Sequence, residues 1–249
     1  MKSIIKKIIE KIINFYFRLS AQVQKIRYNY ILSLPSKKRN NAFDLYLEEE
    51  QISSYNHFKK YFKSAIFLDF PKILEYSIKE TLNLNLDKSN YYLEFGVFKG
   101  YSINLLSKHV SKIYGFDSFE GLREDWKGWT DSANTFDLDG IIPKVNSNVF
   151  LIKGWVQDTL DEFIKKNESK INFVHLDLDT YESTKYVLEK IKPRLEENSI
   201  LIFNQFYNFP GWSSGEYKAF SETFDENEYD YLAFGLRTTH VAVKIKNTK

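Results

Sequence analysis

The stretch EFGVFKGYS, residues 94–102, decides the fold. It overlaps the end of the apolar run Tyr91–Phe95, which predicts a β-strand, and it leads into a helical pattern from about Tyr101 to Val110. The form E-x-G-x-x-x-G puts two glycines in the turn between strand and helix. Glycine permits a tight turn and lets a ligand approach the backbone closely. Ligands of open α/β sheets bind outside the carboxyl ends of the strands, so this turn predicts a binding site.

Beyond this turn, short apolar strands alternate with helical stretches, which is typical of a parallel sheet with crossover helices. The last two strands are too close in sequence for a crossover helix and should be antiparallel. The sequence thus predicts an α/β fold, a Rossmann-like doubly wound sheet of seven strands, mostly parallel, with a C-terminal antiparallel hairpin. The further strands are expected at Ile113–Asp117, Val149–Ile152, Ile171–Asp177, Ile200–Phe203, Tyr229–Phe234 and Thr239–Ile245, with helices ending near Lys166 and spanning Tyr181–Leu195.

The composition is that of a folded globular protein, with 43% apolar and 27% charged residues in 249. The chain has no cysteine, which excludes disulfides, thiolate nucleophiles and cysteine-ligated zinc. Together with the lack of a recognisable secretory leader, this predicts a cytoplasmic protein. No run of about 18 apolar residues without a charge occurs, so a membrane-spanning helix is not expected.

Charge is distributed unevenly along the chain. Residues 1–40 contain ten Lys or Arg and one acid, Glu10, whereas the remainder is mildly acidic. An acidic body binds a phosphate backbone poorly, so nucleic acid is not an expected partner.

Residues 1–87 are predicted to form an N-terminal helical extension and residues 88–249 the α/β domain. Within the extension, isoleucines recur with helical spacing over residues 3–18 opposite lysines, which predicts a basic amphipathic helix. Two roles stay open for it: peripheral contact with an anionic membrane, or packing on its own domain or on a second subunit. We favour packing, because most amphipathic helices are packed, and expect a homo-oligomer.

The residues around the glycine turn favour a cationic ligand. A nicotinamide dinucleotide fingerprint reads G-x-G-x-x-G, with the pyrophosphate at the helix N-terminus. Here the glycine spacing differs, and Glu94 would repel a diphosphate. S-adenosylmethionine has a sulfonium and an amino group and no phosphate, so it fits better than the cofactor of an oxidoreductase.

Asp117 ends the second strand, where a carboxylate can accept hydrogen bonds from both hydroxyls of an adenosine ribose. A single acid at a strand end is more often a turn or helix cap, but the glycine turn beside it favours the ribose role. After the third strand, Trp155 or Gln157 could meet the adenine ring. A core position is nearly as good an interpretation for Trp155.

Four stretches of the chain resemble the macrocin O-methyltransferase family, whose members are class I S-adenosylmethionine-dependent enzymes acting on sugar hydroxyls. They are EFGVFKGYS at 94–102, GFDSFEGL at 115–122, VHLDLDTYEST at 174–184 and FYNFPGW at 206–212. The similarity covers roughly residues 88–246 and implies that 88–249 are a methyltransferase domain. With the arguments above, the predicted cofactor-binding residues are Glu94, Gly96, Lys99, Gly100, Ser102, Asp117, Ser118, Trp155, Gln157 and Asp177.

In that family a magnesium ion is held by an acid ending the fourth strand and by an acidic pair ending the fifth. Asp177 matches the first position, but Asn204 and Gln205 stand in place of the pair. Magnesium prefers charged oxygen ligands, so a metal site of Asp177, Asn204 and Gln205 should be weak and degenerate. Asp179 lies past the strand end, where its direction is open. We predict no tight magnesium site.

The expected reaction is in-line displacement of the sulfonium methyl by a hydroxyl oxygen, accelerated mainly by positioning. Asp177 is the first choice as catalytic base, because it ends a strand beside the predicted cofactor site. A structural carboxylate, or a contact to the methionine part of the cofactor, is an equally open role for it. His175 lies in mid-strand, where a histidine usually belongs to the core, and His240 is a weaker candidate base.

Two loops complete the predicted site. Residues 207–212 either line the acceptor pocket with aromatic faces or form a proline-glycine turn with buried aromatics. The loop between Ser118 and Asn146, with Trp126 and Trp129, is long enough to be a lid that excludes water.

The sequence therefore predicts an S-adenosylmethionine-dependent O-methyltransferase for a small sugar-like acceptor. The alternative is a protein that binds S-adenosylmethionine without catalysis, as a scaffold or regulator, which the Asn204-Gln205 pair favours.

Overall fold

A computed structural model describes residues 41–84, 86–126 and 135–246. The amphipathic helix predicted over residues 3–18, and Trp129 of the predicted lid, lie outside the described residues.

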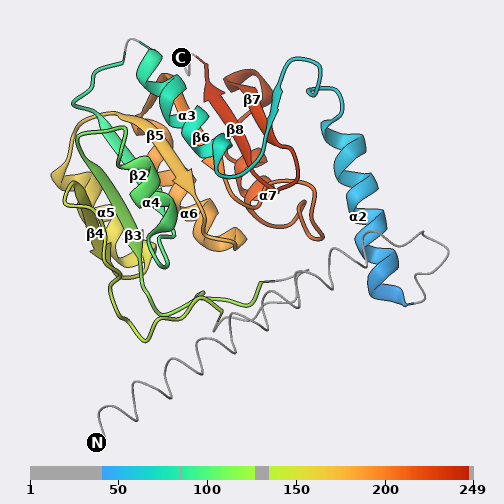
Figure 1. Cartoon of the computed structure of the whole chain (residues 1–249), viewed down its shortest axis with the longest axis horizontal. Coiled ribbons are helices and arrows are strands. Elements are labelled where there is room, and N and C mark those ends of the chain that lie inside the picture. The colour runs from blue at the N-terminus through green and yellow to red at the C-terminus, as the bar shows by residue number, and fades with distance from the viewer. Residues whose placement is uncertain (1–40, 85, 127–134, 247–249) are drawn as a thin grey trace, which may run out of the picture. The chain divides into compact units, whose positions relative to one another are not determined.

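Within the described residues, eight strands form one mixed sheet with the order β1-β7-β8-β6-β5-β2-β3-β4 (Figure 1). The neighbours from β6 to β4 are parallel, whereas β8 is antiparallel to both β6 and β7. This confirms the predicted Rossmann-like α/β fold and its C-terminal antiparallel hairpin. The strands are β1 (Ile66–Leu68), β2 (Tyr91–Phe95), β3 (Ile113–Asp117), β4 (Val149–Lys153), β5 (Ile171–Leu176), β6 (Leu195–Phe203), β7 (Tyr229–Gly235) and β8 (Val241–Ile245).

The eighth strand, β1, corrects the predicted number of seven. Residues 57–84 read as helix in the sequence, yet Ile66–Leu68 pair in parallel with Ala233–Gly235 of β7. Three residues at a sheet edge are too few to display the two-residue periodicity of a strand, so tertiary pairing decides their conformation.

The sheet belongs to a compact unit that comprises Glu49–Lys249. Residues 49–87, which the sequence analysis assigns to the extension, therefore share a unit with the strands that follow. The reason is physical: β1 continues the sheet, and α3 (Lys72–Asn83) buries Ile73, Leu74 and Ile78 in the core.

Helices cover both faces of the sheet (Figure 1). α3 and α4 (Tyr101–Leu106) pack into one apolar cluster with strand residues, and α5 (Val156–Lys166), α6 (Tyr181–Ile191) and α7 (Glu216–Ser221) pack into the other. Every residue of β5 is buried, as expected for a central parallel strand covered on both sides. α2 (Ala42–Phe58) precedes β1.

In the part of the chain that the structure describes, none of the helices has the length and apolar character of a membrane-spanning segment. The parallel strands β2 to β6 all direct their carboxyl ends to one edge of the sheet, and the candidate site is at this edge.

Candidate functional site

The glycine turn after β2 lies directly against the end of β5. Gly96 has φ +87°, and a Cβ atom on it would lie 1.9 Å from the carbonyl oxygen of Asp177. Gly100 has φ +79° and is the residue before α4. Only glycine satisfies both the conformation and the close approach at position 96, so the sequence signal has a structural cause.

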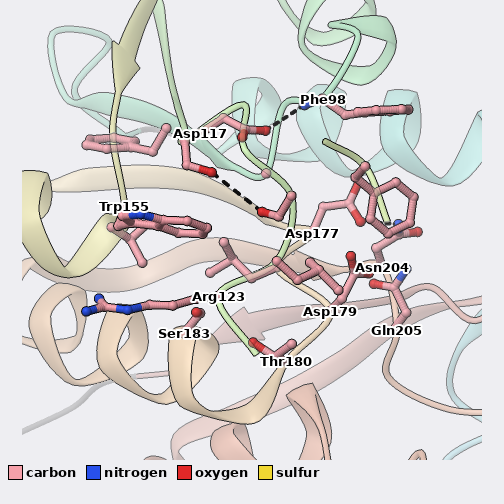
Figure 2. Close-up of a pocket in the computed structure, with 18 of the residues that line it drawn as sticks. Phe98, Asp117, Arg123, Trp155, Asp177, Asp179, Thr180, Ser183, Asn204 and Gln205 are labelled. Carbon is pink, nitrogen blue, oxygen red and sulfur yellow. Dashed lines mark hydrogen bonds between the residues drawn. The ribbon is translucent and has the colours of Figure 1, made fainter. Parts of the chain in front are cut away.

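Asp117, the last residue of β3, holds this turn in place. Its Oδ2 accepts a hydrogen bond from the backbone N–H of Phe98 at 2.7 Å (Figure 2). The same oxygen accepts the backbone N–H of Val97 at 2.7 Å, and Oδ1 accepts that of Phe119 at 2.7 Å. A carboxylate offers about four lone-pair positions, so one acceptor position is left for a ligand. Asp117 both shapes the turn and lines the cavity beside it.

Glu94 does not face that cavity. Its side chain is fully buried, accepts a hydrogen bond from Ser102 Oγ at 2.9 Å, and lies 3.0 Å from Nδ1 of His175 on β5. Burial raises the pKa of Glu94. Burial is the largest influence on His175 and lowers its pKa, but the hydrogen bond to Glu94 and the charges of Glu94, Asp177 and Glu216 together raise that pKa above its usual value. Glu94 therefore anchors β2 to β5 and α4, and the expectation that it flanks a ligand at the turn is not met.

A cavity opens where β2, β3, β4, β5 and β6 end, and we call it the first cavity. It contains about 880 Å³ of atom-free space, part of it open to solvent. Asp117 and Trp155 lie on one side of it, and Asn204 and Gln205 lie on the other (Figure 2). Leu122, Arg123 and Phe136 come from the long loop after β3.

The predicted site residues divide into two groups. Seven line the first cavity, and five do not. Those that line it are Gly96, Asp117, Ser118, Trp155, Asp177, Asn204 and Gln205. Lys99 and Ser102 line a separate cavity on the α4 side. Glu94 and Gly100 are buried and line neither cavity, and Gln157 donates to Ser183 Oγ at 3.3 Å.

Sequence reasoning missed several residues of the cavity wall. Phe98 has φ +47° and packs edge-to-face on Phe136, with ring centroids 5.3 Å apart. Thr180 and Ser183 follow β5, where the stretch VHLDLDTYEST already pointed to the site. Arg123 and Phe136 belong to a loop without periodicity, and only the three-dimensional fold brings them to the strand ends.

The carboxyl ends of β5 and β6 are joined through side chains. Asn204 donates a hydrogen bond from its amide nitrogen to Oδ1 of Asp177. Burial raises the pKa of Asp177, while His175 and the hydrogen bond from Asn204 oppose this rise. The buried Glu216, at the start of α7, accepts the backbone N–H of Gln205 at 2.8 Å, and burial raises its pKa to about 8.

This donor set does not fit a magnesium site. The amide of Asn204 directs its nitrogen, not its oxygen, at Asp177, and neutral amides are weak ligands for a hard cation. The residues that the structure describes contain no group of three or more His, Asp or Glu side chains that could hold a metal ion. We therefore derive no step through a metal.

The two predicted loops differ in their contribution. The 207–212 loop fits the buried-aromatic alternative: Tyr207, Phe209 and Trp212 lie in the core, and Trp212 packs on Phe58 with centroids 5.3 Å apart. The loop after Ser118 contributes to the first cavity through Arg123 and Phe136, while Trp126 is buried in the core.

Comparison with known proteins places the site in context. Residues 93–206, from β2 to just beyond β6, match a family model described as a methyltransferase domain. No curated protein sequence matches the chain significantly.

Solved structures have a similar fold. The calicheamicin methyltransferase CalS11 is 19% identical over 90% of this chain and 91% of that chain, with a TM-score of 0.57. The O-methyltransferase NovP is 15% identical over 71% of this chain and 79% of that chain, with a TM-score of 0.55. A ligand-free structure of CalS11, described as a TDP-rhamnose 3'-O-methyltransferase of calicheamicin biosynthesis, is 19% identical over 90% and 93%, with a TM-score of 0.51.

Proposed function

We propose, from the methyltransferase domain at residues 93–206, that this methyltransferase transfers a methyl group from S-adenosylmethionine to a hydroxyl of a sugar or glycoside. The observation that carries the proposal is the first cavity. Asp117 and Trp155 line one side of it and Asp177 lies beyond the glycine turn, all at the carboxyl ends of parallel strands.

The charges of the first cavity suit a cationic ligand. Its lining includes Asp117, Asp177 and Asp179, against the single base Arg123. A diphosphate would meet net repulsion there, whereas a sulfonium and an ammonium group would be attracted. The charge balance thus supports S-adenosylmethionine over a nicotinamide dinucleotide, although Glu94 takes no part in it.

The cofactor contacts that we propose are based on the residues that line the first cavity. The remaining acceptor position of Asp117 would take a ribose hydroxyl, and the half-exposed face of Trp155 would meet the adenine ring. The methionine part would then lie over the Gly96 turn, towards Asp177. These assignments leave the reactive methyl near the ends of β5 and β6.

When bound, S-adenosylmethionine supplies an electrophilic methyl on a good leaving group. The chain's main task is then to hold the acceptor oxygen in line with that methyl at about 3–3.5 Å. Asp177 is the proposed base for the hydroxyl proton. Burial raises its pKa towards neutral pH, and a general base is most effective when its pKa lies near the working pH. Asn204 orients Asp177 through its hydrogen bond.

The proposed acceptor is a hydroxyl of a sugar. The four stretches that resemble the macrocin O-methyltransferase family support a sugar hydroxyl, and the structure of CalS11 described above is that of a TDP-rhamnose 3'-O-methyltransferase. A homo-oligomer in the cytoplasm, with residues 1–40 in the subunit contact, stays a prediction; deleting those residues should lower the mass measured by light scattering.

The catalytically silent alternative rests on Asn204 and Gln205, which replace the expected acids. A silent protein would bind S-adenosylmethionine and form no methylated product.

The experiment has two arms. Isothermal calorimetry with S-adenosylhomocysteine should give saturable binding, and incubation with S-adenosylmethionine and TDP-rhamnose should give a product heavier by one methylene in mass spectrometry. Binding with no product from a panel of nucleotide sugars and glycosides would favour the silent alternative. The proposed function would be contradicted if S-adenosylhomocysteine gave no heat of binding and no increase in the melting temperature.

A further inference from the structure

A second cavity adjoins the first one. It lies on the α4 side of the glycine turn, contains about 780 Å³ of atom-free space, and reaches the loop between β7 and β8. Phe98, Asp177 and Asn204 line both cavities, so the two spaces are neighbours at the residues that follow β5 and β6. A ligand in each space would therefore approach the other beside Asp177.

Two buried imidazoles line this second cavity, and each has one ring nitrogen without a hydrogen-bond partner among the described residues. His175 uses Nδ1 for Glu94, and His240 has its Nδ1 3.1 Å from Oγ1 of Thr238. In both residues Nε2 is buried and has no hydrogen-bond partner among the residues that the structure describes. His175 is 1% exposed and His240 is 6% exposed. A buried polar atom without a partner costs free energy, which a hydroxyl-bearing ligand would recover.

The part of the wall beside His240 is aromatic. Phe70 lies 5.1 Å from the His240 ring and 5.7 Å from the Tyr101 ring, measured between centroids. Phe70 and Tyr101 are exposed, so apolar surface is available at the cavity. A cavity that combines apolar surface with two polar atoms suits a sugar ring, which has an apolar face and hydroxyls at its edge.

The charges around the two imidazoles come from several elements. Glu94 on β2, Asp177 after β5 and Glu216 on α7 all act on His175. Burial and the neighbouring His175 lower the pKa of His240 to about 3, so its ring is neutral at physiological pH. Lys99 is exposed at the rim. A neutral imidazole with a free Nε2 is suited to exchange a hydrogen bond with an uncharged hydroxyl.

We propose that the second cavity is the acceptor subsite: it holds a polyhydroxylated ring whose hydroxyls bond to Nε2 of His175 and of His240, with the target hydroxyl directed to Asp177. This assignment rests on the proposed function, because it needs the methyl donor in the first cavity. In it, His240 is a positioning residue for the acceptor and contributes nothing to cofactor binding.

The four histidines of the chain make a site-specific test possible, because His57 and His109 do not line the second cavity. The full chain, labelled with ¹⁵N-histidine and saturated with S-adenosylhomocysteine, is titrated with TDP-rhamnose and, separately, with methyl α-L-rhamnopyranoside. Saturable shifts of the Nε2 signals of His175 and His240, with those of His57 and His109 unmoved, are the expected result. No saturable shift at either cavity histidine with either probe would overturn the proposal.

Variants give the second readout. His240→Phe keeps a ring beside Phe70 and removes Nε2, so the KM for TDP-rhamnose should rise about tenfold, the loss expected for one hydrogen bond to a buried group. His240→Gln should recover part of that loss, and His109→Gln serves as the control. The Kd for S-adenosylhomocysteine should stay within twofold in all three.

The outcomes separate the two claims. If the nucleoside fails to bind the wild-type chain, the proposed function fails first. If it binds normally and His240→Phe leaves the KM unchanged, the acceptor subsite alone is refuted.

Discussion

Two regions at the carboxyl ends of the parallel strands differ in how their polar groups are hydrogen-bonded. We call them the β2–β3 corner, where β2 and β3 end, and the β5–β6–β8 corner, where β5 and β6 end and β8 begins. At the β2–β3 corner, Asp117 accepts three backbone N–H groups, and Gly96 packs against the backbone of the next strand. At the β5–β6–β8 corner, Nε2 of His175 and Nε2 of His240 line the second cavity and are buried without a hydrogen-bond partner among the described residues. At the first corner Asp117 already accepts three backbone hydrogen bonds and keeps one acceptor position, whereas the second corner has buried polar atoms without any protein partner among the described residues.

This difference indicates a division of labour. Satisfied polar groups fix a geometry, because any movement would break hydrogen bonds, and fixed geometry is what a cofactor site needs. Unsatisfied buried groups are costly and gain most from a hydrogen-bonding partner. We therefore associate the β2–β3 corner with holding the methyl donor and the β5–β6–β8 corner with the acceptor.

The largest effect is expected from Gly96→Ala. The new Cβ would have to move the backbone of Asp177, and φ +87° is unfavourable for alanine. The free energy of unfolding should therefore fall by about 3 kcal/mol or more. Gly140→Ala is the matched control: φ is also positive there, at +67°, but the close contact of the Cβ would be with the flexible Lys153 amine at 2.9 Å, and a loss of about 1–2 kcal/mol is expected. Urea unfolding measures both. Equal losses would show that the close approach of β2 to β5 is unimportant.

The next largest effect is expected from Asp117→Ala. The substitution leaves three backbone N–H groups of the turn without their acceptor, and the affinity for S-adenosylhomocysteine should fall at least 30-fold, or by about 2 kcal/mol. Calorimetry measures the change. Asp158→Ala, an exposed acid in the first turn of α5, should leave the affinity unchanged. If Asp158→Ala lowered the affinity for S-adenosylhomocysteine as much as Asp117→Ala, the loss would not come from the hydrogen bonds of Asp117.

A smaller effect is expected from Trp155→Ala. Loss of an aromatic wall residue should weaken S-adenosylhomocysteine binding by about 1 kcal/mol, or roughly fivefold. Trp155→Phe keeps an aromatic face and should lose less than twofold. If alanine and phenylalanine variants bind equally well, the adenine ring does not lie on this side chain.

The smallest effect is expected from metal removal. Asn204 and Gln205 offer neutral amides where acids would be needed, so excess EDTA should change the rate of product formation by less than twofold. Added magnesium should likewise have no effect. Rescue of a chelated sample by magnesium would show that Asp177 and the two amides do hold the ion.

Local patterns predicted the sheet well because strand periodicity and turn glycines are local properties. Tyr91–Phe95 and Ile113–Asp117 are strands with the expected bounds, and their ends bring Gly96 and Asp117 to one cavity. The direction of Glu94 was not predictable in the same way, because its partner His175 is 81 residues away in the chain. The same holds for Phe136, which a loop without periodicity carries to the turn.

A crystal structure of the full chain with S-adenosylhomocysteine tests the central claim most directly. The account predicts the nucleoside in the first cavity, with its ribose at Asp117, its adenine at Trp155, and its sulfur beside Asp177 at the junction with a second cavity that stays free. A nucleoside bound in the second cavity, against His175 and His240, would contradict the assignment of both spaces.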